Sequence, residues 1–295
     1  MFERITTTRS ELLALLCAAL GVCFLTPADA PAQTVNMEQL TRIISGETIL
    51  ERDDDEDEHD ESEEFTDEFP FGDCRFVPRG ANAYFSLEPG YQLHLYGEDD
   101  GEQVELFITV LRQTYDVLIE IDGEVQRVRT RVIQEREFID CELYEISHNY
   151  YALCRETNDI YYFGEAVCFF EDDVCIGDDG SWLAGQNGAM PGIIMPGTFL
   201  LGSRYYQEVA PGVALDLAEH IDMGLTMTVP AGILEDCVLI AEGSGLEDPG
   251  AEGEKYYAKD IGLIKDGELE LIGYGFISGR ELRELERDPM NPSSD

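Results

Sequence analysis

Residues 104–121 read VELFITVLRQTYDVLIEI, and apolar side chains alternate with polar ones along much of this segment. Two apolar faces result, the first made of Val104, Leu106, Ile108 and Val110 and the second of Val117, Ile119 and Ile121. A period of two residues is typical of half-buried strands, because successive side chains of a strand point to opposite sides of its sheet. The segment therefore predicts β-structure with one buried face.

Turn sequences recur between similar runs along the chain. They are Pro89-Gly90, Asp99-Asp100-Gly101, Asp122-Gly123, Asp178-Asp179-Gly180 and Asp266-Gly267. Asp and Gly favour the backbone conformations of tight hairpin turns. Short alternating runs joined in this way predict a mainly β fold over residues 74–277, a curved antiparallel sheet or half-barrel meander with few short helices.

Helical patterns are rare. Ser278 and Glu281 have the spacing of a capping box, which predicts a short C-terminal helix to about Arg287 within a tail of residues 278–295. Residues 213–221 are a second candidate helix.

The N-terminus has the three-part layout of a secretory signal. Arg4 and Arg9 precede an apolar run over residues 12–25, and small residues follow it up to Ala32. The run is shorter than the ~20 residues that a membrane-spanning helix needs. We expect cleavage of residues 1–32, with Gln33 as the new N-terminus, no membrane span after processing, and a secreted or periplasmic location.

The chain is strongly acidic, with 62 Asp and Glu against 19 Lys and Arg and a formal net charge of -43. This balance excludes nucleic acid as a partner, because neutralising phosphates requires clustered Lys and Arg. Acidic residues concentrate in residues 51–68, and we expect residues 33–73 to form a disordered acidic leader. Such a leader would bind Ca²⁺ weakly. The turn sequences lack the acid and Gly spacing of an EF-hand loop, so no metal-binding residues are assigned.

Six cysteines remain after removal of residues 1–32. They are Cys74, Cys141, Cys154, Cys168, Cys175 and Cys237. An even number of cysteines in an exported chain favours disulfides. A hairpin over residues 169–174 would place Cys168 opposite Cys175, and we predict a bridge between them. Cys141 with Cys154, leaving Cys74 with Cys237, is an expectation that the spacing does not fix.

Residues 180–197 read GSWLAGQNGAMPGIIMPG and contain the only tryptophan of the chain. Exposure of large apolar side chains to water is unfavourable, also in a loop rich in Gly and Pro. We expect the loop to cover one end of the sheet as a plug, with its large apolar residues buried. The alternative is a lid that contacts a ligand. The residues in question are Trp182, Ile193, Ile194 and Met195.

The motifs of this loop and of the segments on both sides of it carry a family resemblance. They are Tyr84-Phe85-x-Leu87-x-Pro89-Gly90, Tyr161-Tyr162-Phe163-Gly164-Glu165, the loop from Gly180 to Pro196, Val229-Pro230-Ala231-Gly232, and Lys255-Tyr256-Tyr257-Ala258-x-x-Ile261-Gly262-Leu263-Ile264. Together they resemble an uncharacterised family of exported bacterial β-rich proteins. The resemblance extends from Asn82 to Ile264 and implies a curved antiparallel sheet, with no activity and no site residues. The cysteines and the acidic leader depart from the family's pattern, so it implies no disulfides.

Signatures of catalysis are lacking in the sequence. It contains no Gly-x-Ser-x-Gly, Ser-x-x-Lys, His-Glu-x-x-His or Cys-x-x-Cys motif and no phosphate or dinucleotide fingerprint, so no cofactor is predicted. The histidines are scattered, at His59, His94, His148 and His220. On the candidate helix, His220 with Asp216 and Glu219 would form either a weak metal face or a solvated acidic surface.

The sequence therefore predicts an exported, non-catalytic β-sheet protein that binds a ligand or acts as a scaffold at the cell envelope. The expected partner is an apolar ligand or an envelope protein. One alternative is low-affinity Ca²⁺ buffering by the acidic leader. The other is a hydrolase that uses carboxylates near residues 180–187, with Asp178 and Asp179 as candidates.

Overall fold

The computed structural model describes residues 65–121, 123–172, 174–246, 252–287 and 290. The chain divides into two units, and every described residue belongs to the unit of Met1–Gly21 and Phe65–Asp295. The predicted signal segment and most of the acidic leader, with its expected Ca²⁺ binding, lie outside the described residues.

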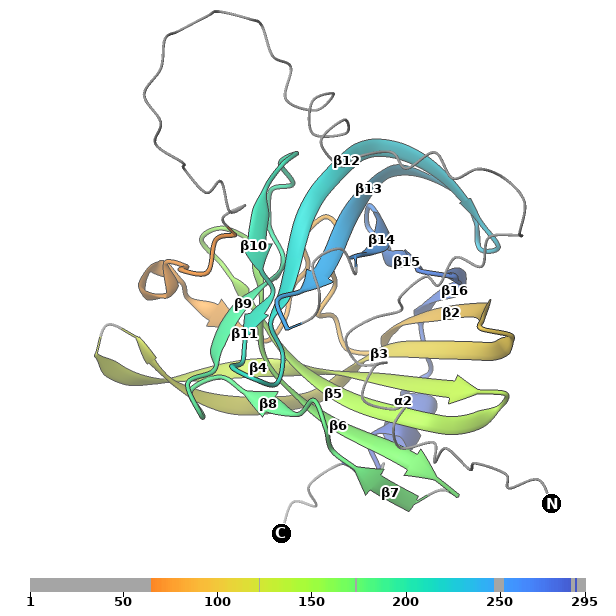
Figure 1. Ribbon diagram of the computed structural model, residues 1–295, viewed down its shortest axis with the longest axis horizontal. Helices are drawn as coiled ribbons and strands as arrows, with labels where there is room; N and C mark the ends of the chain where they lie inside the picture. Colours follow the sequence, from red (N-terminus) through yellow and green to blue (C-terminus); the bar gives the residue numbers. More distant parts are fainter. Residues whose placement is uncertain (1–64, 122, 173, 247–251, 288–289, 291–295) are drawn as a thin grey trace, which may run out of the picture. The chain divides into compact units, whose positions relative to one another are not determined.

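The described residues form sixteen strands, a short 3-10 helix η3 (Phe71–Asp73) and an α-helix α2 (Gly279–Leu285), as Figure 1 shows. The first eight strands are β1 (Phe76–Val77), β2 (Tyr91–Asp99), β3 (Glu102–Ile121), β4 (Glu124–Ile139), β5 (Glu142–Cys154), β6 (Ile160–Glu171), β7 (Val174–Gly177) and β8 (Trp182–Leu183). The others are β9 (Met190–Met195), β10 (Arg204–Tyr206), β11 (Glu208–Val209), β12 (Asp216–Val229), β13 (Gly232–Ser244), β14 (Glu252–Ala258), β15 (Gly262–Asp266) and β16 (Leu269–Phe276).

The main sheet is antiparallel and curves almost into a closed barrel (Figure 1). Its strand order is β10-β12-β13-β14-β15-β16-β2-β3-β4-β5-β6-β9-β11. The two ends of this order, β10 and β11, are separated in the chain by Gln207 alone, whose backbone N–H donates to the carbonyl oxygen of Asp216 at 2.8 Å. The predicted curved antiparallel fold is confirmed, and the sheet closes further than a half-barrel.

Strand β3 contains the segment from which the fold was predicted. Val104, Val110, Val117 and Ile119 are buried in the main core, as the alternation requires. The turn between β2 and β3 has positive φ at Asp100 (49°) and at Gly101 (87°), where the sequence predicts a turn. Both signals are local, which is why they can be read without knowledge of the fold.

The end of the expected leader differs from the prediction. Phe69 and Phe71 pack against Tyr161, with ring centroids 5.9 Å and 5.5 Å from it. Their aromatic side chains give residues 65–73 apolar surface to bury, which the preceding acidic run lacks.

The two helix predictions have opposite outcomes. The C-terminal helix is confirmed as α2, with Ser278 and Glu281 forming the reciprocal capping box. The helix over residues 213–221 is wrong, because β12 begins at Asp216 and pairs with β13 and β10. The backbone N–H and C=O groups of β12 form hydrogen bonds with two neighbouring strands, and this pairing outweighs the weak helical pattern of its sequence. Among the described residues, no helix is both long and apolar enough to cross a membrane.

Two cysteine pairs lie at disulfide distance. The sulfurs of Cys168 and Cys175 are 1.95 Å apart at the β6–β7 hairpin, the pair expected from the sequence. Cys175 faces Phe170 in the ladder and not Cys168, because the register shifts between Phe169 and Phe170. The disulfide therefore joins two residues that are not directly opposite each other in the β6–β7 hairpin.

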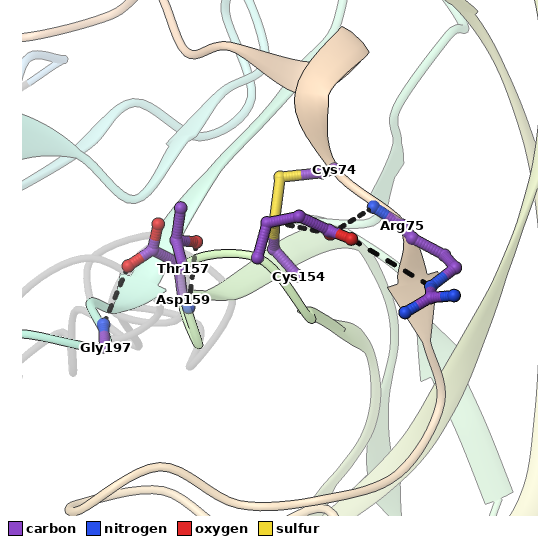
Figure 2. The surroundings of a disulfide bond; sticks show 7 residues. Cys74, Arg75, Cys154, Thr157, Asp159 and Gly197 are labelled. Carbon is purple, nitrogen blue, oxygen red and sulfur yellow. Dashed lines mark hydrogen bonds and ion pairs between the residues drawn. A yellow bond between two sulfur atoms is a disulfide. The ribbon is translucent and has the colours of Figure 1, made fainter.

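The second pair joins Cys74 to Cys154 at 2.15 Å and ties the segment before β1 to the end of β5 (Figure 2). Next to it, the backbone N–H of Arg75 donates to Glu156 Oε2 at 2.7 Å. The alternative pairings of Cys141 with Cys154 and of Cys74 with Cys237 are wrong. Cys141 lies exposed in the turn before β5 and Cys154 at the far end of this continuous strand, and Cys237 is buried in β13.

Candidate functional site

Seven carboxyl groups from six strands and the ammonium group of Lys255 from a seventh are linked by electrostatic interactions. We term them the interior carboxyl cluster: Glu135, Glu137, Glu165, Glu208, Asp216, Glu242, Asp266 and Lys255. Electrostatic interactions join Glu165 to Glu135, and Glu208 to both Asp216 and Glu242. Strands far apart in the sequence thus bring these groups into one region.

Strand β4 shows how the fold positions them. Glu135 pairs with Ile108 and Glu137 with Leu106 across the β3–β4 ladder. Cross-strand partners share a face, so both carboxyls point to the side on which β3 buries its apolar residues. An acid thus occupies two positions where a core strand would normally place an apolar side chain.

Lys255 is the basic member of the cluster. Its Nζ atom lies 2.8 Å from Glu242 Oε2 and 3.6 Å from Asp266 Oδ2. Gln207 donates from Nε2 to the other oxygen of Glu242 at 2.8 Å. Burial lowers the pKa of Lys255, but the facing carboxylates of Asp266 and Glu242 raise this pKa well above its ordinary value. Lys255 is therefore charged and already paired.

The remaining carboxyls have raised pKa values. Burial, the largest cause, raises the pKa of Glu135 and of Glu137 to about 7 and that of Glu165 to about 8. The three side chains nevertheless retain some accessible surface. Burial also raises the pKa of Glu208 well above its ordinary value, and hydrogen bonding between Glu208 and Asp216 favours one shared proton.

A cavity of about 340 Å³ adjoins the cluster at Glu165. Its lining residues come from β3, β5, β6, β8 and the segments before β8, after β8 and after β11: Tyr115, Tyr150, Glu165, Ala166, Ser181, Trp182, Leu183, Gln186, Asn187, Ala189, Ala210, Pro211 and Val213. Glu165 and Trp182 are register partners of β6 and β8. Burial, the nearby Tyr115 and the charge of Glu165 raise the pKa of Tyr150 to about 12, so its hydroxyl stays protonated.

Aromatic rings form part of the cavity wall. Tyr115 and Tyr150 stack with their centroids 4.6 Å apart, and Tyr162 meets Trp182 edge-on at 5.1 Å. Trp182 is 7% exposed, and no described residue accepts a hydrogen bond from its Nε1. A buried indole N–H without an acceptor is uncommon, because an unmade hydrogen bond costs about 1 to 3 kcal/mol.

The structure separates the four tentative ligand-contact residues. Trp182 lies in β8 and lines the cavity. Ile193, Ile194 and Met195 lie in β9, where Ile193 pairs with Tyr161 and Met195 with Ile160. They pack against the core and are not among the residues that line the cavity. The segment that we expected to be a loop thus contributes two strands.

The other candidate groups are not assembled into a site. Asp178 and Asp179 are exposed and do not line the cavity. His220 points inward from β12, where its Nε2 accepts from the Tyr205 hydroxyl at 2.9 Å and its Nδ1 donates to the Leu200 carbonyl at 3.0 Å. Burial lowers the pKa of His220 to about 4, so the ring is neutral.

The expected face of His220 with Asp216 and Glu219 does not form, because alternate residues of a strand point to opposite sides. Glu219 instead pairs with Arg204, with 3.0 Å between Oε2 and Nε. Within the described part of the chain, no group of three or more His, Cys, Asp or Glu side chains could hold a metal ion.

The sequence contained one usable signal for the cluster. Ile133, Glu135, Glu137 and Ile139 are spaced by two, so the acids share the face of the core residue Ile133 and of the partly buried Ile139. In a chain with 62 acidic residues this pattern is inconspicuous, and the positions of Glu208, Glu242 and Asp266 depend on strands that meet only in the folded barrel.

Comparison of the chain with protein-family models, with curated proteins and with solved structures finds no match. The family resemblance seen in the motifs stays an expectation, and the function is inferred from the site.

Proposed function

We propose that this protein is an exported, non-catalytic binding protein that holds a small molecule in the cavity beside Glu165 and Trp182. The observation that supports it most is the composition of the cavity wall, which combines aromatic rings with one carboxyl group. Ligand pockets typically have such a wall, apolar for the most part with a few polar groups that orient the ligand. A volume of about 340 Å³ is within the usual range for small ligands.

Disulfides support the location part of the proposal. The pairs Cys74–Cys154 and Cys168–Cys175 are compatible with a periplasmic or extracellular protein, since thiols stay reduced in most cytosols. The signal-like N-terminus supports the same location. Detection of a mature chain that starts at Gln33 in material from outside the cytoplasm would test it, and an intact Met1 there would contradict it.

Binding is tested by a thermal-shift screen of the mature protein against neutral, anionic and cationic small molecules. A molecule that binds only the folded state raises the unfolding midpoint. Each hit is then titrated while the fluorescence of Trp182 is followed, because this single tryptophan lines the cavity. If no compound class shifts the midpoint, the proposal fails.

A matched pair of variants locates the binding. Val213 lines the cavity and is 45% exposed, so Val213→Phe narrows the cavity without a change in the core. Val125 is 72% exposed in β4 and is not a lining residue, so Val125→Phe adds the same bulk elsewhere. We expect weaker binding for Val213→Phe alone. Equal binding by the two variants would place the ligand outside the cavity.

A further inference from the structure

Resting on the proposed function, we propose that the ligand is an organic cation that lies against the Glu165 carboxylate and the aromatic rings of the cavity wall. Two features of the cavity support this ligand class. They are the excess of carboxyl groups over basic groups behind the cavity and the aromatic wall.

Carboxyl groups outnumber basic groups where the cavity meets the interior carboxyl cluster. The Ser147 hydroxyl, a neutral group, hydrogen-bonds to Glu165, whereas the Tyr162 hydroxyl donates to Asn149 Oδ1. No ion pair with a described basic residue involves Glu165. Lys255 is held by Glu242 and Asp266, so it supplies no countercharge. A cationic ligand would provide the positive charge that the protein does not place beside Glu165.

The aromatic wall favours an organic cation over a metal ion. Tyr115 and Tyr150 contribute rings to the cavity, and the faces of aromatic rings attract alkylammonium groups. The described residues offer no set of three metal ligands, and the cavity is far larger than a single ion. Ca²⁺ therefore serves as a contrasting probe.

The test compares acetylcholine, which combines a quaternary ammonium with an ester acceptor, with its uncharged carbon isostere 3,3-dimethylbutyl acetate. Calorimetric titration of the full mature protein at pH 8 measures both affinities, and CaCl₂ is titrated separately. We expect acetylcholine to bind at least about tenfold more tightly, the effect of one charge-assisted contact of about 1.4 kcal/mol.

Variants assign the contact with the carboxyl group. Glu165→Gln should abolish the preference for acetylcholine, whereas Glu120→Gln, at an exposed position of β3, should keep it. Circular dichroism of each variant verifies that it is folded.

Failure of this inference can be distinguished from failure of the proposed function. Equal affinity for the two isosteres, or a preference that survives Glu165→Gln, would overturn the cation assignment while leaving a binding cavity. Tight binding of CaCl₂ that is lost in Glu165→Gln would also overturn it, in favour of a metal. If acetylcholine does not bind but neutral or anionic compounds from the screen do, the ligand class is wrong and the binding function stands.

Discussion

Glu165 of β6 and Trp182 of β8 occupy facing positions of an antiparallel ladder, and both residues line the same cavity. Burial raises the pKa of Glu165 to about 8. Titratable groups with strongly shifted pKa values often lie at binding sites. Four predictions test the surrounding structure.

The interior carboxyl cluster should make the protein less stable as the pH rises. Glu135, Glu137 and Glu165 have native pKa values of about 7, 7 and 8, above their ordinary value of 4.5. Between pH 4.5 and these native pKa values, the native state thus binds more protons than the unfolded state. Their stabilising contribution is full below pH 4.5 and is lost as the pH rises through 7 to 8.

Urea unfolding at a series of pH values from 5 to about 9 measures this dependence. The Glu165→Gln variant should show a flatter decline between pH 6 and about 8, with Glu120→Gln as the control. His220, whose pKa is lowered from 6.5 to about 4, acts in the opposite direction between these two values, so it reduces the decline below pH 6.5 but does not reverse it, because one imidazole opposes three carboxyls. A free energy of unfolding that stays constant or rises from pH 6 to about 8 would show that the carboxyls are not buried as described.

Substitutions at two glycines near β8 can distinguish the cost of a strained backbone from the cost of steric crowding. Gly185 has φ +82° and Gly188 has φ +83°. A Cβ atom at Gly185 would lie 2.2 Å from the carbonyl oxygen of Leu118, whereas a Cβ at Gly188 would meet nothing within 4 Å. Gly188→Ala should cost about 1 to 2 kcal/mol for the left-handed backbone, and Gly185→Ala about 1 to 3 kcal/mol more. Equal losses in chemical denaturation would contradict this packing of the turn on β3.

The two disulfides should differ in their contribution to stability. The Cys74–Cys154 bridge spans 80 residues and the Cys168–Cys175 bridge spans 7. Chain entropy alone gives about 4.5 kcal/mol for the longer loop and about 2.4 kcal/mol for the shorter one. We therefore expect the double variant Cys74→Ala/Cys154→Ala to unfold at a lower urea concentration than Cys168→Ala/Cys175→Ala. The reverse order would indicate that the segment before β1 contributes little to the native fold.

Arg131 should be required at the irregular point of the β3–β4 ladder. The register shifts between Val110 and Thr114, and the buried guanidinium donates from Nη1 to the carbonyl oxygens of the intervening residues: Leu111 at 3.2 Å, Arg112 at 2.6 Å and Gln113 at 3.1 Å. Arg131→Met leaves these carbonyls without their donor and should cost about 3 kcal/mol. Arg127→Met, at an exposed position of the same strand, should change stability by about 0.5 kcal/mol or less. Similar losses in the two variants would contradict this role.

The parts of the fold that could be predicted are those determined by residues close together in the sequence. The alternation in residues 104–121 and the capping box of Ser278 with Glu281 are local patterns, and both appear in the structure as expected. The incorrect helix over residues 213–221 was also read from a local pattern. Its backbone groups pair with β10 and β13, and no local pattern indicates these partners.

Only part of the candidate site could be predicted from the sequence. Trp182 could be singled out because it is the only tryptophan, in a segment rich in Gly and Pro. Its neighbour in space, Glu165, is one of 62 acidic residues, and no property of its own position distinguishes it. The long bridge is similar, since Cys74 and Cys154 are 80 residues apart and meet only after β1 pairs with β5.

Residue order alone establishes that this chain makes antiparallel strands with tight turns, since those preferences arise from side-chain alternation and from the backbone conformations of Asp and Gly. Closure of the sheet through Gln207, and with it the confinement of seven carboxyls around Lys255 and the pairing of Glu165 with Trp182, is decided by the tertiary structure. The reason is that burial and charge proximity depend on which strands become neighbours, and that is a property of the whole barrel.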